Sequence, residues 1–254
     1  MNLIGSLRAA LLCAASIFFS GCSTTPPVPA GSLTTGDRVG VLVQSSDHPL
    51  HVHVGFLVFG NFNKSYPYTW HVGGKVFDAL DKTVRASGLA TVDLAKQGLA
   101  PADLQGVVQI QDKQWVVAPN KAALFQHLRD DLKLKALVVL TPSRVMAIQQ
   151  CTQFGCTEFF IDGPGIASRP FATFLTAVAG YKWSVVNLVD VADLALASPI
   201  SSDLRIPTRT TELTDSSEDV VRWGSKEWGQ VEDSIAEFSA DVMELAVRQL
   251  KKDH

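Results

Sequence analysis

Three histidines lie close together in the segment His48-Pro-Leu-His51-Val-His53. Alternation along a β-strand would place His51 and His53 on the same face. Neutral imidazoles with this spacing can bind zinc or copper, although a complete site needs a third or fourth ligand. His71 and Asp47 are candidates for that ligand, but no established spacing selects them. The pattern predicts either a metal site at His51 and His53 or, as the more common alternative, polar histidines on the exposed face of an edge strand.

A second group of candidate binding residues is aromatic. The segment from Asn61 to Trp70 is polar overall, yet it contains Phe62, Tyr66, Tyr68 and Trp70. Aromatic side chains outside a core are common anchors of protein interfaces. We therefore treat Tyr66, Tyr68 and Trp70 as a candidate interface, and the alternative is that they cover the end of a sheet.

Recognised catalytic motifs do not occur in the sequence. It has no Gly-x-Ser-x-Gly elbow and no His-Glu-x-x-His helix, and Gly73-Gly-Lys75 lacks the rest of a phosphate-binding loop. Alternation in a strand would put Asp190 and Asp193 on opposite faces, which argues against a catalytic carboxylate pair. Asp162, in Asp162-Gly-Pro-Gly165, is expected to organise a turn. We therefore predict no catalytic residue and no cofactor, and we expect that the chain is not an enzyme.

The N-terminal residues are organised like an export signal. Arg8 precedes an apolar run over residues 9–19, which is shorter than the roughly 20 residues that a membrane-spanning helix needs. Small residues come directly before Cys22, and residues rich in Ser, Thr and Pro follow it. The sequence predicts a signal peptide over residues 1–21, with ordinary secretion as the alternative to a processed cysteine.

The segment Phe19-Ser-Gly-Cys22 resembles the lipobox of bacterial lipoproteins, with Phe19 where the family usually has Leu. The resemblance implies that Cys22 is acylated with fatty acids such as palmitate, becomes the new N-terminus and serves as the membrane anchor. Ser23 follows the cysteine, and by resemblance to enterobacterial lipoproteins this implies the cell outer membrane, with the domain facing the periplasm.

Only Cys151 and Cys156 would remain as thiols in the processed chain, because Cys13 leaves with the signal peptide and Cys22 is acylated. An exported protein in an oxidising compartment tends to pair such neighbours, and Gly155 allows a tight loop between them. We predict a disulfide bond between Cys151 and Cys156. The alternative, a redox-active pair, lacks the two-residue spacing of thiol oxidoreductases.

Composition limits the classes of protein that need to be considered. The net charge is −3, so the composition gives no electrostatic argument for binding to nucleic acid or to anionic lipid. With 46% hydrophobic residues, the chain is long enough to form one large domain. We divide it into the signal peptide, a flexible tether over residues 22–36 that reaches roughly 40 Å, and a single domain over residues 37–254.

The hydrophobic pattern predicts an α/β fold, with a mixed sheet, packed helices and a long C-terminal amphipathic helix. The first two strands are expected to form a hairpin, residues 171–197 an extended antiparallel ribbon, and residues 198–220 a surface loop. Asn120 is the expected N-cap of one helix, Gly88 ends another, and the C-terminal helix docks on the sheet or pairs with a second helix. Strands are expected at residues 38–43, 51–59, 91–94, 107–110, 114–117, 135–140, 145–150 and 158–161, and helices at 70–87, after Asn120, and at 228–250.

This order of elements resembles the periplasmic α/β lipoprotein domain shared by the curli-secretion channel lipoprotein, the lipoprotein activator of penicillin-binding proteins and the N-terminal domain of the Tol-system propeller protein, over most of residues 37–252. The family is not enzymatic and assembles with envelope machinery or stimulates it. The resemblance implies protein-protein interaction in envelope assembly or secretion, with an envelope protein partner or by self-assembly. The alternatives are a periplasmic metal-binding protein or hydrolase that uses His48, His51 and His53, and a multimeric complex into which the ribbon at residues 171–197 inserts.

Overall fold

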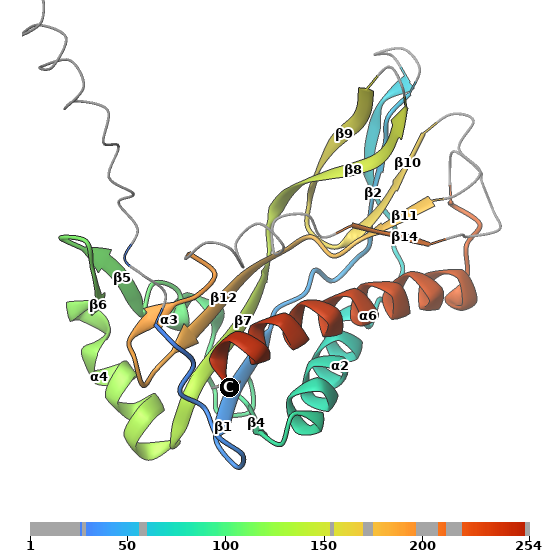
Figure 1. Cartoon of the computed structure of the whole chain (residues 1–254). Coiled ribbons are helices and arrows are strands. Elements are labelled where there is room, and N and C mark those ends of the chain that lie inside the picture. The colour runs from blue at the N-terminus through green and yellow to red at the C-terminus, as the bar shows by residue number, and fades with distance from the viewer. Residues whose placement is uncertain are drawn as a thin grey trace, which may run out of the picture.

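The computed structural model describes residue 26 and residues 29–55, 60–152, 155–169, 175–196, 208–211 and 220–251, with the backbone alone for 147–152, 155–158 and 208–211. It confirms the predicted α/β class, because mixed sheets pack with helices and a long helix ends the described chain. Figure 1 shows the helices beside one group of strands, and a second, β-rich region next to them.

The first sheet forms the centre of the molecule, in the strand order β13-β12-β7-β1-β4. β1 (Arg38–Val43), β4 (Ala90–Asp93) and β7 (Leu134–Pro142) are parallel. β12 (Tyr181–Asn187) is antiparallel to β7, and β13 (Ala192–Asp193) is antiparallel to β12. The strand predicted at residues 135–140 lies within β7, so that prediction is confirmed.

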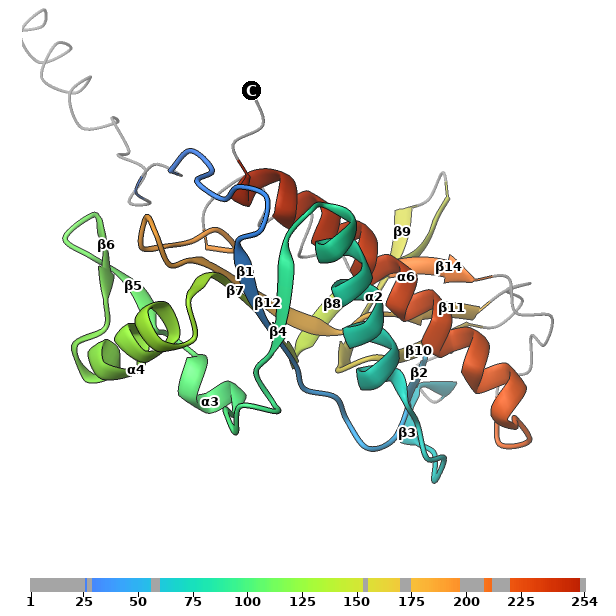
Figure 2. The ribbon, with the colours of Figure 1, turned by 90° about the horizontal axis from the view of Figure 1, so that it is seen from below.

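Helices cover both faces of this sheet. α2 (Val72–Ala86) and α6 (Ser225–Leu250) lie on one side, and Figure 2 shows α3 (Pro101–Leu104) and α4 (Ala122–Gln126) on the other. The π-helical turn η4 (His127–Asp131) continues α4. The sheet is therefore the middle layer of three.

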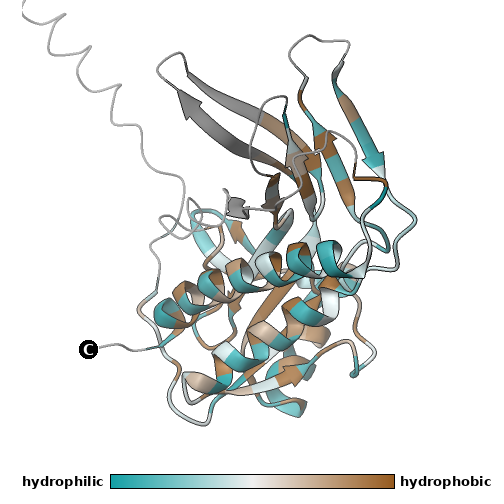
Figure 3. Cartoon of the chain, turned by 90° about the vertical axis from the view of Figure 1, so that its right-hand side faces the viewer, coloured by the Kyte–Doolittle hydropathy of each residue, from teal (hydrophilic) through white to brown (hydrophobic). Residues whose placement is uncertain are grey.

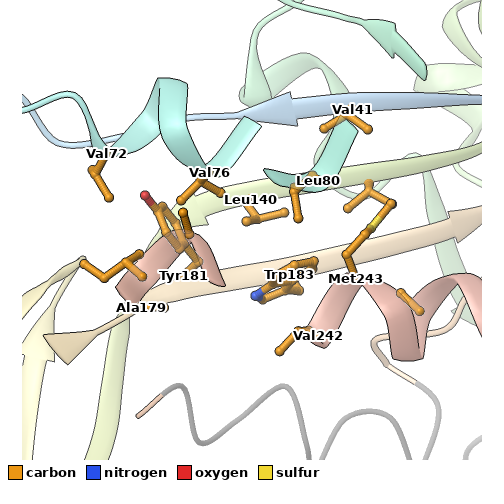
Figure 4. Packing of buried hydrophobic residues seen from close by; sticks show 14 of the residues in the cluster. Val41, Val72, Val76, Leu80, Leu140, Ala179, Tyr181, Trp183, Val242 and Met243 are labelled. Atoms are coloured by element: carbon orange, nitrogen blue, oxygen red, sulfur yellow. The ribbon is translucent and has the colours of Figure 1, made fainter. Parts of the chain in front are cut away.

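The face under α2 and α6 is closed by a continuous apolar core. Val41, Leu140 and Trp183 from three neighbouring strands meet Val76 of α2 and Met243 of α6, as Figure 4 shows. In Figure 3 the strands behind the two helices are mainly hydrophobic, whereas the helices carry hydrophilic residues toward the viewer. The predicted amphipathic stripe thus docks on the sheet and on α2.

A second sheet has the strand order β14-β11-β10-β2-β3. It contains β2 (Leu50–His53), β3 (Phe62–Ser65), β10 (Gly165–Ser168), β11 (Leu175–Val178) and β14 (Thr208–Thr211). β2 and β10 are parallel, and the other neighbours are antiparallel. One face of this sheet joins the core under α6.

The other face of the second sheet packs against a long hairpin made of β8 (Arg144–Thr152) and β9 (Gly155–Asp162). We call this hairpin the β8–β9 arm. Figure 1 shows the arm extending away from the end of α6 at which the C-terminus lies. Its backbone follows directly from β7, so the arm is rooted in the centre of the first sheet.

A small hairpin of β5 (Val108–Gln111) and β6 (Gln114–Val117) lies beside α3. Asp112 and Lys113 at its turn have φ of 50° and 62°, and a two-residue hairpin loop of type I′ requires a positive φ at both residues. Gly88 ends α2 with φ of 76°. The predicted strands at residues 107–110 and 114–117 and the predicted helix end at Gly88 are confirmed.

Four local predictions are wrong. Residues 198–220 are not all surface loop, because Thr208–Thr211 form β14 and pair with β11. β1 and β2 do not form a hairpin, because β4 and β7 occupy both edges of β1 and β2 lies in the other sheet. β11 and β12 do not form one ribbon, because the chain changes sheet at Gly180. Gly180 lies so near the backbone of Gly163 that a Cβ at residue 180 would be 2.1 Å from the carbonyl oxygen of Gly163. Asn120 does not cap a helix; it lies in the 3₁₀ turn η3 (Pro119–Lys121), and α4 begins at Ala122.

The packed part of the chain begins earlier than the predicted domain boundary at residue 37. Leu33 is 1% exposed and forms a bridge with Lys251, and the backbone N–H groups of Ser32 and Leu33 donate to the carbonyl of Leu250. A Cβ at Gly31 would overlap the Lys251 carbonyl, which shows how closely the segment lies against the end of α6. Residues 1–25, with Cys22 and the predicted signal peptide, lie outside the described residues.

Candidate functional site

The two central histidines of the sequence cluster belong to a buried polar network. His51 and His53 are 0% and 3% exposed, and both contact the hydroxyl of Ser168 on the neighbouring strand β10. The Oγ of Ser168 lies 2.6 Å from Nε2 of His51 and 2.8 Å from Nδ1 of His53. The hydroxyl of Tyr66 lies 3.1 Å from Nδ1 of His51. Strand alternation therefore does put both histidines on one face, as predicted.

This network can satisfy its hydrogen bonds with neutral rings. The Ser168 hydroxyl has one proton and can donate to one imidazole while it accepts from the other. If it donates to His53, His51 donates through Nε2 and accepts from the Tyr66 hydroxyl through Nδ1. A buried polar group that is paired in this way avoids the penalty of about 1–3 kcal/mol for an unmade hydrogen bond.

The alternative of histidines on an exposed edge strand is wrong, because β2 lies between β10 and β3 and both rings are buried. Phe62 of β3 stacks on His53 with ring centroids 4.9 Å apart, and Lys64 lies 4.4 Å above the same phenyl ring. Cross-strand neighbours thus cover the histidines from the edge of the sheet.

The further metal ligands considered from the sequence lie elsewhere. Asp47, His48 and His71 line a separate depression beside the first turn of α2. His48 contacts the carbonyl of Tyr68 through Nδ1, at 3.2 Å. Across the part of the chain that the structure describes, no three His, Cys, Asp or Glu side chains are placed to hold one metal ion.

The aromatic residues of the candidate interface surround Trp228 of α6. Tyr66, Tyr68 and Trp70 have ring centroids 5.6, 5.9 and 6.2 Å from that of Trp228, and Trp223 lies 5.1 Å away. Tyr66 and Trp70 are each 7% exposed, and Tyr68 is half-buried. Their position favours the alternative interpretation, in which they close the core, and leaves Tyr68 as the one with accessible surface.

Glu232 connects the long helix to the beginning of α2. Its side chain is buried, accepts the backbone N–H of His71 at 2.7 Å, and pairs with Lys75 at 3.1 Å. α2 has no side-chain cap and no acidic residue in its first turn. A carboxylate from α6 therefore supplies the negative charge that the N-terminus of α2 favours.

Cys151 and Cys156 are direct partners in the register of the β8–β9 arm. Opposite residues in an antiparallel pair have Cα atoms about 4.5–5.5 Å apart, a separation that a disulfide can bridge. The disulfide itself remains a prediction, since the structure describes only the backbone at these positions.

The acidic residues differ in their surroundings. Asp162 ends β9 beside Gly163, whose φ is 147°, so it belongs to the predicted turn. Asp190 is exposed and accepts from Asn187, whereas Asp193 is 8% exposed. The carboxylates of Asp190 and Asp193 thus lie in different environments, which agrees with the prediction that they do not form a catalytic pair.

Asp193 lines a cavity of about 230 Å³ on the face of the first sheet that α3 and α4 cover. Val139 and Thr141 of β7 and Ser184 of β12 form part of its floor, and Leu104 of α3 part of its wall. Burial raises the pKa of the Asp193 carboxyl, although hydrogen bonds from Ser184 and two backbone N–H groups oppose that change. This cavity combines apolar walls with one buried acid, which is the usual character of a small-ligand site.

Sequence reasoning missed Ser168, Glu232 and the cavity at Asp193. A serine in a β-rich run carries no signal that it will lie between two histidines more than 100 residues away. Glu232 offers one weak signal, because it interrupts the apolar face of α6 next to Val231. No local pattern reports the cavity, since its walls come from four separate segments.

Comparison of the chain with models of protein families, with curated proteins and with solved structures found no match. Within the described residues, none of the helices combines the length and the apolar character that crossing a membrane requires.

Proposed function

We propose that this protein is an exported, lipid-anchored component of the bacterial cell envelope that acts by binding another envelope protein. The anchor is Cys22, on the resemblance of Phe19-Ser-Gly-Cys22 to a lipobox, and the expected location is the periplasmic side of the outer membrane. The observation that carries the binding role is an exposed apolar pair on the β8–β9 arm.

The arm has one packed face and one open face. Val145 and Ile161 are opposite each other and contribute to the core beneath the arm, whereas the next pair, Met146 and Phe160, is 39% and 52% exposed. The guanidinium of Arg144 lies 4.8 Å from the centre of the Phe160 ring. Aromatic residues, Met and Arg are the residues enriched in protein interfaces, so this pair and Arg144 form a suitable contact surface.

The position of the arm agrees with a tethered binding role. The chain joins the domain at Gly31–Leu33, against the end of α6, and Figure 1 shows the arm extending away from that end. A linker from Cys22 to Gly31 would reach about 30 Å when extended, at about 3.1 Å per residue. The domain would be held near the membrane by one end, with Met146 and Phe160 accessible at a distance from it.

Site-specific photocrosslinking in the native envelope tests the contact surface. A photoreactive residue is placed at Met146, at Phe160 or, as a control, at Val221, which is 70% exposed. We expect the same crosslinked envelope protein from positions 146 and 160 and not from 221. In a Met146→Ala variant, the yield at position 160 should fall several-fold because the neighbouring apolar contact is removed.

Two outcomes would contradict this proposal. Equal crosslinking from all three positions would show that the arm has no specific partner. A product with twice the mass of the chain would show self-assembly in place of a different partner. The lipid anchor is tested separately, because a Cys22→Ala variant should lose incorporation of labelled palmitate and leave the membrane fraction.

Export also predicts that Cys151 and Cys156 are paired in the cell. Thiol alkylation before and after reduction should show no free cysteine in the processed protein and two after reduction. A Cys151→Ser and Cys156→Ser double variant should be about 2 kcal/mol less stable, because closing so short a loop restricts the unfolded chain only modestly. Two free thiols in protein taken directly from the envelope would contradict the pairing.

A hydrolase or metal-binding protein remains the second candidate, and one observation favours it. The Ser168 hydroxyl lies within 2.6 Å of an imidazole nitrogen, as a serine nucleophile and its base would. Ser168 is 3% exposed, however, so a substrate would need the aromatic residues to open. Labelling of Ser168 by a fluorophosphonate, or binding of zinc or copper at micromolar concentration, would support this candidate, and neither is expected from the buried network.

A further inference from the structure

The cavity at Asp193 lies between the first sheet and the segment around α3. Its floor is the part of β7 and β12 where Thr141 lies opposite Lys182 and Val139 opposite Ser184. Leu104 and Val108 form apolar walls, and Leu196, which is 51% exposed, lies at the rim. The cavity is smaller than the pockets of about 300–1,000 Å³ that hold drug-sized molecules, so its occupant is small.

Asp193 is the buried charge in this cavity. Its Oδ1 accepts the backbone N–H groups of Val185 at 3.3 Å and Ala195 at 3.0 Å, and its Oδ2 accepts the hydroxyl of Ser184 at 2.9 Å. A carboxylate has about four acceptor sites, so the geometry leaves acceptor capacity on Oδ2. The carboxylate is held in place by its neighbours and can take one more donor from the cavity.

The burial of Asp193, in contrast to the exposed side chain of Lys182, indicates a cation as the bound group. Lys182 lines the cavity and attracts the Asp193 carboxylate at longer range, but the described residues include no salt-bridge partner for either side chain. A buried carboxylate without a close counter-charge gains from a bound cationic donor, because a charge-assisted hydrogen bond replaces lost hydration. A metal ion would need more oxygen ligands than one carboxylate provides.

From these features we infer that the cavity binds a small apolar molecule that carries a protonated amine, with the ammonium group on Asp193 and the apolar part against Leu104, Val108 and Val139. The ammonium group donates to Oδ2 of Asp193, next to the Ser184 hydroxyl. The apolar walls disfavour sugars and other molecules with many hydroxyl groups, whose polar groups would lose their hydrogen bonds to water there.

Three probes of nearly equal shape test the inference on the purified full chain at neutral pH: benzylamine, benzyl alcohol and benzoate. Binding is followed by NMR chemical-shift changes at the amides of Thr141, Ser184 and Asp193. We expect benzylamine to bind ~10-fold more tightly than benzyl alcohol, since one charge-assisted contact contributes about that factor. Benzoate should bind most weakly because its charge repels Asp193.

Two variants show whether the preference comes from this carboxylate. Asp193→Asn keeps an oxygen for the two backbone N–H groups and should bring benzylamine binding to within about 2-fold of benzyl alcohol, since the charge is gone. Asp190→Asn removes a nearby exposed charge outside the cavity and should leave the preference for the amine unchanged. Melting curves of both variants verify that they are folded.

Three results would overturn the inference. These are the absence of benzylamine-dependent shifts at millimolar concentration, tighter binding of benzoate than of benzylamine, and an unchanged preference for the amine in folded Asp193→Asn. If Asp193→Asn does not fold, the order of the three probes and the location of the shifts in the unmodified chain decide the question alone.

Discussion

The two faces of the first sheet are covered in different ways. On one face, α2 and the 26-residue α6 pack on the strands in a continuous apolar core, and Trp183 and Tyr181 from β12 are 5% and 1% exposed. On the other face, α3 has four residues and α4 has five, and the layer leaves the cavity at Asp193. The strands are the same for both faces, so the difference comes from the length of the covering helices.

This difference separates a face that stabilises the fold from a face that can bind a ligand. A long helix presents a continuous apolar stripe, and each buried large side chain contributes about 1.5–3 kcal/mol. Short helices cover less of the strand surface, and polar groups such as Thr141 and Ser184 are then left at a partly open surface. Substitutions on the closed face should therefore affect stability, and substitutions around the cavity should affect binding.

The largest effect is expected for Trp228→Ala on the closed face. Trp228 is 1% exposed and contacts four aromatic side chains, so its removal should lower the free energy of unfolding by about 3–5 kcal/mol. The matched change at the cavity rim, Leu196→Ala, should stay within about 0.5 kcal/mol because that side chain is half exposed. Urea unfolding measures both, and equal losses would show that the two faces do not differ as described.

An intermediate effect is expected where α6 meets α2. Glu232→Ala removes the acceptor of the His71 N–H group and the buried partner of Lys75, and should lower stability by about 2–3 kcal/mol. Asp233→Ala is the control, since Asp233 pairs with the same Lys75 at 2.7 Å but is 64% exposed, and should change stability by less than about 0.5 kcal/mol.

Thermal unfolding of the two variants at low and at high salt sharpens this contrast. The small effect of Asp233→Ala should shrink further with salt, because exposed charges are screened. The effect of Glu232→Ala should persist. A Glu232→Ala variant as stable as Asp233→Ala would mean that the carboxylate does not cap α2.

The same contrast explains how much of the fold the sequence could predict. α2 and α6 cover their face with stripes of period 3.6, and the apolar run of β7 is continuous, so the closed face could be predicted from local patterns. The positions of β2 and β12 could not be predicted in this way. A strand carries the same alternation in either sheet, and the change of sheet at Gly180 depends on its approach to Gly163.

The candidate sites were harder to predict for a related reason. The pairing of His51 with His53 follows from strand alternation, but their burial depends on Ser168 and Phe62 from other strands. Tyr66 and Trp70 have the composition of an interface and become core residues only because Trp228 comes to lie against them. Local sequence thus identifies residues whose side chains could bind a ligand or a partner. Long-range contacts decide whether these residues face solvent, the core or a cavity.

The smallest effect, and the one that best separates the two faces, is the pH dependence of stability at Asp193. Burial raises the pKa of its carboxyl in the folded protein above the ordinary value. The folded state therefore holds this proton more tightly than the unfolded chain, and the group favours folding at low pH and opposes it increasingly as the pH rises past the unfolded value of about 3.9. Asp193→Asn cannot ionise, so its stability relative to the unmodified chain should increase between pH 4 and neutral pH.

Urea unfolding of both proteins across this range gives the difference directly, and the contributions of the other carboxylates cancel. Asp190→Asn, at an exposed position, should show no such trend. A protonated amine bound in the cavity would favour the ionised carboxylate, so benzylamine should reduce the difference between the chain and Asp193→Asn at neutral pH. A difference that stays flat with pH would mean that the Asp193 carboxyl has the same pKa in the folded and the unfolded chain, and would contradict the rise that burial causes.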